Sequence, residues 1–415
     1  MPSYVTHLEG AIDGARLPGG TAQTLHKDRP LWVRYDLDAV GKALTKEMLL
    51  QRSATMWRYR ELLPPERDES IVSLGEGMTP LLRCERLGSR LGLNDFWIKD
   101  EAQLPTGSFK SRGQSAAVTM AREFGIKRLA IPTAGNAGGA MAAYAARAGM
   151  EAFVICPADT PVINQFEAQL AGAHVFLVDG LITDCGKIVR AGIEPMGWFD
   201  VSTLKEPYRI EGKKTMGLEL AEQFGWKLPD VILYPTGGGT GLIGMWKAFA
   251  ELKELGWLQS GTMPRMVAVQ SEGCCPIVRA FEAGSRFAEP FEGAATVASG
   301  LRVPAAVGDF MILDAIRESG GCAVAVEEAR IIEWMRLATS SEGISVCPES
   351  AACVGAAEKL AADGWVNADD RVLLFNCGAA QKYPDLVELA LPRIEKNANI
   401  DWQWIAERAS ARAGR

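Results

Sequence analysis

The 415-residue chain lacks the features that mark membrane, secreted and nucleic-acid-binding proteins. No apolar run reaches the roughly 20 residues that a membrane helix needs. The N-terminal stretch from Met1 to His7 has no basic region followed by an apolar segment, so we expect no signal peptide. Charged residues make up 23% of the chain and the formal net charge is −7, with no basic stripe. We therefore expect no nucleic-acid partner and no membrane association.

Cysteine and histidine are too scattered to indicate a disulfide framework or a metal site. The nine cysteines are odd in number, and Cys274 and Cys275 are adjacent, which does not suit zinc. The three histidines, His7, His26 and His174, are isolated, and we interpret them as structural or exposed. We expect no bound metal and a cytoplasmic location.

What the sequence does contain is enough apolar residue, 48%, for a large core, in a strand–helix alternation from about residue 95 onward. Apolar runs predict strands at 96–99, 129–131, 153–155, 175–178, 231–234, 266–269 and 372–375. Helical stretches lie at 108–124, 138–148 and 161–171, the last with Thr160 as a plausible N-cap. This alternation predicts an α/β fold with two lobes, each a parallel sheet covered by helices.

Four regions are expected along the chain. Residues 1–75 form an N-terminal extension that is turn-rich and cysteine-free, with a helix near 42–61. A smaller α/β lobe is expected at 76–204 and a larger one at 205–393. The remaining 394–415 is a charged tail, expected to be helical.

Two glycine turns carry the chemistry. In Pro105–Lys110, a Gly-Ser turn precedes Lys110 at a helix start; Ser108 can cap that helix, and Phe109 can desolvate the amine. The turn Pro235–Gly241 follows a strand and can present backbone N–H groups to a phosphate. A reactive amine and a phosphate cradle together fit a phosphorylated aldehyde cofactor, pyridoxal 5'-phosphate.

The chain resembles the fold-type-II family of pyridoxal-phosphate enzymes, the group of tryptophan synthase β, cysteine synthase and threonine dehydratase. Within it the resemblance is greatest to the threonine synthase family. It runs in order from about residue 70 to 390 and rests on five segments: 75–81 (GEGMTPL), 106–113 (TGSFKSRG), 134–138 (AGNAG), 207–212 (PYRIEG) and 235–241 (PTGGGTG).

The resemblance implies the cofactor site. The cofactor would lie in the cleft between the two lobes, with Lys110 as Schiff-base lysine and proton shuttle. Asn136 would hydrogen-bond the cofactor's 3'-oxygen, and Cys377 would stand where the family places a neutral partner for the pyridine nitrogen. The cofactor-binding residues are then Phe109, Lys110, Asn136, Gly237, Gly238, Gly239, Thr240 and Cys377.

The resemblance also implies a substrate site at Arg209, with Ser202 and Thr203 nearby, for the phosphate of O-phosphohomoserine. The chain departs from the family at Ser111, and at Ala137–Gly138 where small hydroxyl residues are usual. The expected reaction is conversion of phosphohomoserine and water to threonine and phosphate. Alternatives are a serine or threonine dehydratase, a β-replacement synthase, or a non-catalytic protein with this fold. The family habit implies a homodimer.

Overall fold

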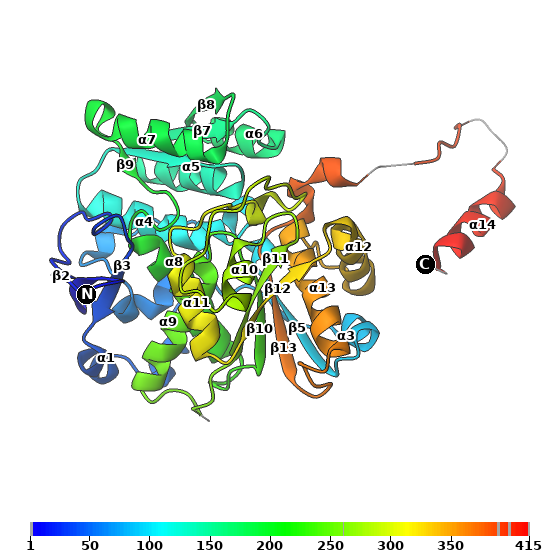
Figure 1. Cartoon of the computed structure of the whole chain (residues 1–415), viewed down its shortest axis with the longest axis horizontal. Helices are drawn as coiled ribbons and strands as arrows, with labels where there is room; N and C mark the ends of the chain where they lie inside the picture. The colour runs from blue at the N-terminus through cyan, green and yellow to red at the C-terminus, as the bar shows by residue number, and fades with distance from the viewer. Residues whose placement is uncertain (1–2, 260, 388–390, 397–399, 414–415) are drawn as a thin grey trace. The chain divides into compact units, whose positions relative to one another are not determined.

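A computed structural model describes residues 3–259, 261–387, 391–396 and 400–413 (Figure 1). The chain divides into two compact units, Met1–Pro384 and Asp385–Arg415. The second unit contains one helix, α14 (Trp402–Ala413), where a helical tail was expected. Of the expected extension and tail, residues 1–2, 397–399 and 414–415 lie outside the described residues.

The larger sheet of the first unit has six strands in the order β12-β11-β10-β13-β5-β4. All neighbours are parallel except β4, which is antiparallel to β5. Its strands are β12 (Cys322–Val326), β11 (Arg265–Ser271), β10 (Val231–Pro235), β13 (Arg371–Asn376), β5 (Asp95–Asp100) and β4 (Leu81–Arg83). Every residue of β10 is buried, as expected for a strand covered by helices on both faces.

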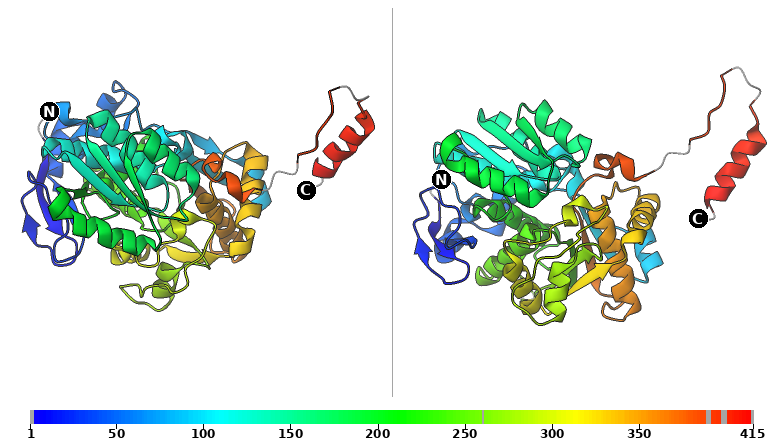
Figure 2. Two further views of the ribbon diagram at one scale, coloured as in Figure 1. Left: turned by 90° about the horizontal axis from the view of Figure 1, so that it is seen from above. Right: turned by 45° about the horizontal axis from the view of Figure 1, so that its top comes forward.

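The smaller sheet has four parallel strands in the order β8-β7-β6-β9. They are β8 (His174–Val178), β7 (Glu151–Pro157), β6 (Arg128–Pro132) and β9 (Phe199–Asp200). Because successive strand residues face opposite ways, Leu129 and Ile131 of β6 pack toward the cluster containing Met141, while Ala130 packs with Val189. Figure 2 shows this sheet and its helices as a layer distinct from the six-stranded sheet.

Helices connect the strands and cover both sheets. The helices of the first unit are α1 (Leu37–Ala43), α2 (Lys46–Leu49), α3 (Glu85–Leu91), α4 (Lys110–Glu123), α5 (Asn136–Ala148), α6 (Val162–Leu170), α7 (Ile182–Met196), α8 (Tyr208–Gln223), α9 (Thr240–Glu254), α10 (Pro276–Glu282), α11 (Asp309–Glu318), α12 (Ile331–Glu342) and α13 (Pro348–Ala362). Every strand predicted from the apolar runs is present, so the α/β class with parallel sheets is confirmed.

The expected lobe boundary at residue 76 differs from the division that the sheets make. Strand β5 pairs with β13 over Asp95–Asp100, so residues 81–100 belong to the six-stranded sheet and not with the four-stranded one. An apolar run shows that a strand exists but not which strand it pairs with, because pairing depends on tertiary contacts.

The N-terminal region also differs from the prediction. The helix expected near 42–61 is wrong: α1 ends at Ala43, α2 covers only Lys46–Leu49, and a 3₁₀ helix follows at Met56–Leu62. Thr45, which is extended, caps α2 through its side chain and interrupts the run. A three-stranded antiparallel sheet that the sequence did not reveal precedes these helices, formed by β1 (Val5–Gly10), β2 (Arg16–Leu17) and β3 (Leu31–Tyr35).

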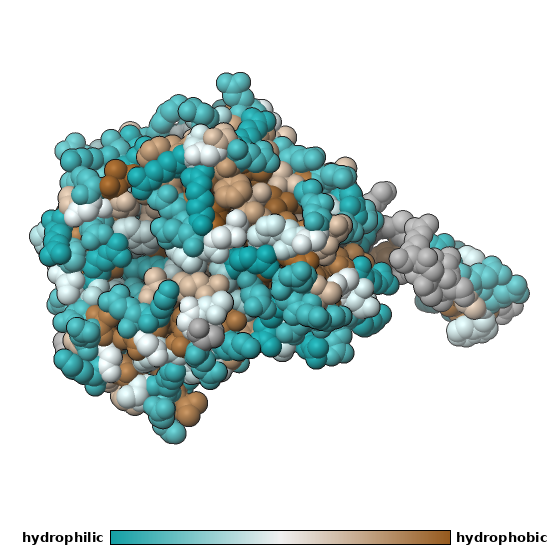
Figure 3. Space-filling view, turned by 60° about the horizontal axis from the view of Figure 1, so that its bottom comes forward, coloured by the Kyte–Doolittle hydropathy of each residue, from teal (hydrophilic) through white to brown (hydrophobic). Residues whose placement is uncertain are grey.

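Hydrophilic side chains cover most of the face seen in Figure 3, with smaller apolar areas between them. Among the described residues, no helix combines the length and apolar character needed to cross a bilayer. In the same residues, no three His, Cys, Asp or Glu side chains gather so that they could hold a metal ion.

Candidate active site

The turn before α4 is fixed by the loop that follows β13. Thr106 (φ 64°) and Gly107 (φ 62°) both adopt left-handed backbone, which reverses the chain just before Lys110. Ser108 forms a β-bridge with Gly378, and the N–H of Phe109 donates to the carbonyl of Cys377 over 2.9 Å. The expected cap by Ser108 is wrong: Phe109 is the N-cap of α4 and has no side-chain capping bond.

Lys110 is the first residue of α4, and its amine lies 4.4 Å from the centroid of the Phe109 ring. Burial, and then the positive charge of Arg209, lower the pKa of Lys110 to about 8. The carboxylate of Glu349 acts in the opposite direction. A pKa near 8 leaves a useful fraction of neutral amine at neutral pH, which is the form that attacks an aldehyde.

Asn136 begins α5 and faces the Lys110 turn. Its Nδ2 donates to the hydroxyl of Tyr383 over 3.4 Å, and its buried Oδ1 has no partner among the described residues. A Cβ added to Gly378 would lie 3.4 Å from the Gly107 carbonyl and 3.6 Å from the Asn136 amide. The Lys110 turn, the start of α5 and the end of β13 therefore meet around Gly378.

Two residues that the sequence did not indicate hold Asn136 in place. The Tyr383 hydroxyl donates to Glu349 over 2.8 Å, and the Gly300 N–H donates to the same carboxylate oxygen over 2.8 Å. Burial, and then Glu349, raise the pKa of Tyr383, which keeps its hydroxyl protonated as a donor. Glu349 is in the first turn of α13 and Tyr383 follows a 3₁₀ helix, so no local motif connects them.

The glycine turn after β10 is packed so closely that side chains could not be accommodated. A Cβ on Gly237 would come within 2.2 Å of the Gly300 carbonyl, and one on Gly238 within 2.7 Å of Thr203 Cγ2. Gly239 has φ 72°, and α9 begins at Thr240. The first N–H groups of a helix have no acceptor within it, so this turn fits a phosphate group.

Cys377 follows β13 and is buried. Its N–H donates to Ser350 Oγ over 2.8 Å, and burial raises the pKa of its thiol to about 12. The thiol is therefore neutral at physiological pH. A neutral S–H can face an unprotonated pyridine nitrogen, which agrees with the role that the resemblance implies.

Arg209 lies in the first turn of α8 and is 1% exposed. Its Nη1 donates to the Val201 carbonyl over 2.8 Å, whereas Nε and Nη2 have no partner among the described residues. The nearby Glu206 accepts from the backbone N–H groups of Tyr208 (2.6 Å) and Arg209 (3.1 Å), and burial raises its pKa to about 7. A buried guanidinium with two unused N–H groups fits an anionic ligand.

Ser202 and Thr203 differ in what they can offer a ligand. The Ser202 hydroxyl and N–H both donate to Asp200, the latter over 2.9 Å, so the hydroxyl proton of Ser202 is already engaged. Thr203 instead places its methyl group against Gly238 in the glycine turn. The two expected substrate residues are therefore brought near different groups.

A buried ionic network lies behind Lys110. Arg112 contacts Glu101 (Nε to Oε2, 2.6 Å) and Glu219 (Nη1 to Oε2, 2.8 Å), and Lys99 pairs with Glu219. All four side chains are fully buried and join β5, α4 and α8. Removing one member would leave an uncompensated buried charge, so the network holds α4 in register.

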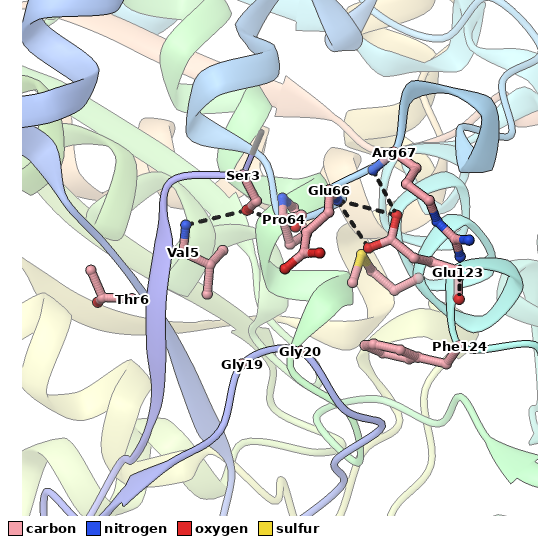
Figure 4. Close-up of a pocket in the computed structure, with 11 residues that line it drawn as sticks. Ser3, Val5, Thr6, Gly19, Gly20, Pro64, Glu66, Arg67, Glu123 and Phe124 are labelled. Carbon is pink, nitrogen blue, oxygen red and sulfur yellow. Dashed lines mark hydrogen bonds between the residues drawn. The ribbon is translucent and has the colours of Figure 1, made fainter. Parts of the chain in front are cut away.

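A separate cavity of about 270 Å³ lies at the opposite end of α4, where Met120, Glu123 and Phe124 face the N-terminal strand (Figure 4). The Glu123 carboxylate accepts the backbone N–H groups of Glu66 (2.9 Å) and Arg67 (3.1 Å) there. None of the residues that line this cavity belongs to the Lys110 site.

The family model described as "Pyridoxal-phosphate dependent enzyme" matches residues 72–378. The chain belongs to this family, and its two parallel sheets place it in the fold-type-II branch. Its cofactor is pyridoxal 5'-phosphate. The free Asn136 Oδ1 and the glycine cradle are where the residues present fit that group.

Within the family the chain is a threonine synthase-like member. It is 34% identical to a threonine synthase of Methanocaldococcus jannaschii over 356 residues, which cover 86% of this chain and 87% of the relative. It is 35% identical to that of Methanosarcina acetivorans over 376 residues, covering 90% and 91%.

Solved structures are similar in fold. Maize serine racemase matches with a TM-score of 0.65 at 19% identity, covering 88% of this chain and 99% of the other. A bacterial threonine deaminase, from the source abbreviated T.th., matches with a TM-score of 0.56 at 27% identity, covering 72% and 92%.

Proposed function

We propose that the protein is a lyase that converts O-phosphohomoserine and water to threonine and phosphate. The observation that carries this proposal is Arg209, whose buried guanidinium keeps two N–H groups without a protein partner among the described residues. Such a group needs an anion, and a substrate with a distal phosphate supplies one. The relatives named threonine synthase, at 34–35% identity over most of both chains, support the same choice.

Pyridoxal phosphate, when bound, supplies an electron sink for negative charge at the substrate's α-carbon. Lys110 binds the cofactor aldehyde and, once displaced by the substrate amine, takes the α-proton. The same amine then moves a proton at the β-carbon, phosphate leaves the γ-carbon and water adds at the β-carbon. One base can serve adjacent carbons because it is fixed at the start of α4.

The remaining residues orient the reactants. Gly237–Thr240 binds the cofactor phosphate through backbone N–H groups, and Asn136 donates to the cofactor's 3'-oxygen. Cys377 faces the pyridine nitrogen as a neutral partner. Arg209 binds the substrate phosphate, with Thr203 beside it. We further propose that the enzyme is a cytoplasmic homodimer.

A dehydratase or β-replacement reaction on serine or threonine is the second candidate. It is favoured by Cys377, because some serine dehydratases carry cysteine at the pyridine nitrogen. The engaged hydroxyl of Ser202 also leaves one fewer donor for a substrate phosphate. The 27% identical structure is named threonine deaminase.

A substrate panel separates the two candidates. Phosphohomoserine, serine, threonine and phosphoserine are each incubated with the holoenzyme, and phosphate, ketoacid and new amino acids are measured. We expect phosphate and threonine from phosphohomoserine alone. Ketoacid from serine or threonine at a higher kcat/KM would favour the dehydratase instead.

A further inference from the structure

A second lysine, Lys213, lies directly beneath the segment that carries Lys110. It is on α8, four residues after Arg209, so both side chains project from one face of that helix. Its amine donates to the carbonyl of Phe109 and lies 4.0 Å from the centroid of the Phe109 ring. The Lys110 amine lies 4.4 Å from the centroid of the same ring.

Glycines make this approach possible. A Cβ on Gly212 would lie 2.1 Å from the Arg112 carbonyl, and one on Gly113 would lie 3.0 Å from Lys213 Cε. The helices α4 and α8 therefore pack with backbone against backbone at this level. The close packing presses the Lys213 side chain under Phe109 and removes it from solvent, leaving it 0% exposed.

Lys213 has no acidic partner, and this distinguishes it from the other buried lysines. In the described part of the chain, Lys99 pairs with Glu219, Lys214 and Lys247 with Glu211, and Lys382 with Glu167. Only the Phe109 carbonyl accepts from Lys213 among the described residues. A buried amine without a carboxylate costs stability, which makes a functional reason for it worth seeking.

We propose that Lys213 is a positioning residue for Lys110: it holds the Phe109 carbonyl, and it forms with Lys110 a pair of buried amines that cannot both carry a proton. The Lys110 amine is thereby kept available in its neutral form for the cofactor aldehyde. The inference rests on the proposed role of Lys110 as the cofactor lysine.

The charges around the pair agree with this role. Burial, and then Lys110 and Arg209, lower the pKa of Lys213 well below that of free lysine, and burial and Arg209 lower the pKa of Lys110. Because the two amines interact, the titration belongs to the pair. The titratable and charged groups that face the pair come from α8, the end of β13, α13, and the segment before and within α4: Arg209, Cys377, Glu349, Glu101 and Arg112.

The test measures Lys110 without turnover. The full-length apoenzyme, freed of cofactor, is labelled with trace acetic anhydride between pH 6 and 11, and the Lys110 peptide is quantified by mass spectrometry. Lys213→Gln keeps a donor for the Phe109 carbonyl but removes the second amine. We expect this variant to raise the labelling midpoint of Lys110 by about one pH unit, roughly tenfold less neutral amine at pH 7.

Lys213→Arg keeps a charge and a donor, and should leave the midpoint at or below that of wild type. Exposed Lys127, quantified in the same digest, should keep its midpoint in every variant. An unchanged midpoint in Lys213→Gln, or an equal rise in Lys213→Arg, would overturn the proposal. If neither variant folds, a wild-type Lys110 midpoint at or above about 10 would also overturn it.

The role of Lys110 itself is tested separately. Borohydride reduction of the holoenzyme followed by peptide mapping identifies the lysine that carries the cofactor. A label on another lysine would refute the proposed function at that point, whereas the acetylation midpoints would still report whether Lys213 controls Lys110.

Discussion

The N–H of Phe109 donates to the carbonyl of Cys377 over 2.9 Å, which joins the two ends of the candidate cofactor site. Phe109 immediately precedes the lysine that would bind the aldehyde, and Cys377 is placed to face the pyridine nitrogen. Since Ser350 in turn accepts from the Cys377 N–H, α13 supports both. The spacing between amine and ring partner is thus fixed by backbone groups, which side-chain substitutions at 377 leave in place.

Lys110→Ala should abolish turnover and the visible absorbance of the bound cofactor, because it removes the amine while the buried Arg112 network keeps α4 folded. The measurements are turnover, the absorbance spectrum and thermal unfolding. Lys127→Ala, at an exposed lysine, is the control and should match wild type. Turnover near the wild-type level in Lys110→Ala would remove this residue from the mechanism.

The rate at which apoenzyme captures pyridoxal phosphate should rise with pH and level off above about 8. Burial lowers the pKa of Lys110 to about 8, so the neutral amine falls about tenfold for each pH unit below that value. Stopped-flow absorbance at several pH values measures the capture rate. A rate that kept rising to about pH 10 would mean that the amine is not perturbed.

Gly238→Asp should weaken cofactor binding by at least ~100-fold, because a carboxylate would enter the phosphate cradle and repel a dianion, and its Cβ would press on Thr203. Titration of the apoenzyme measures the affinity. Gly186→Asp on α7 is the control, since a Cβ there meets nothing within 4 Å. Equal affinity in both variants would locate the phosphate elsewhere.

Cys377→Ser should retain activity, because a hydroxyl is also a neutral partner for the ring nitrogen. Cys377→Asp should protonate that nitrogen, shift the absorbance spectrum and change the ratio of products. Spectra and product analysis on one substrate panel test both variants. If both matched wild type, the thiol would be a packing group only.

Much of the fold followed from the sequence because buried parallel strands form continuous apolar runs, as in β10 and β13. The N-terminal sheet was missed because its strands are short and β1 pairs with β3 across about 25 residues of turns. The location of β5 was missed because its partner, β13, comes more than 250 residues later.

The candidate site divides in the same way. Lys110, Asn136 and the glycine turn stand in local motifs, so their types and spacing were readable. Tyr383 and Glu349 support Asn136 from distant segments, and no local pattern announces such contacts. The engagement of Ser202 by Asp200, only two residues away, was a local signal that could have been used.

Arg209 decides between the two candidate reactions. Arg209→Gln removes the charge-assisted contact to a distal phosphate, a loss of about 2–4 kcal/mol or roughly 30- to 1,000-fold in kcat/KM. The loss should be large for phosphohomoserine and small for serine or threonine, which carry no distal anion. Arg209→Lys, which keeps the charge but not the planar fork, should fall between.

Inorganic phosphate provides a second measure of the same contact. It should inhibit wild type competitively against phosphohomoserine and inhibit Arg209→Gln only weakly, since Nε and Nη2 would no longer be available. The unfolding temperatures of the variants show whether the loss of the Val201 contact disturbs α8. Equal kcat/KM losses on phosphorylated and unphosphorylated substrates, without phosphate inhibition of wild type, would assign Arg209 to the protein's own structure. The dehydratase or β-replacement reaction would then be the better assignment, because neither needs a distal anion site.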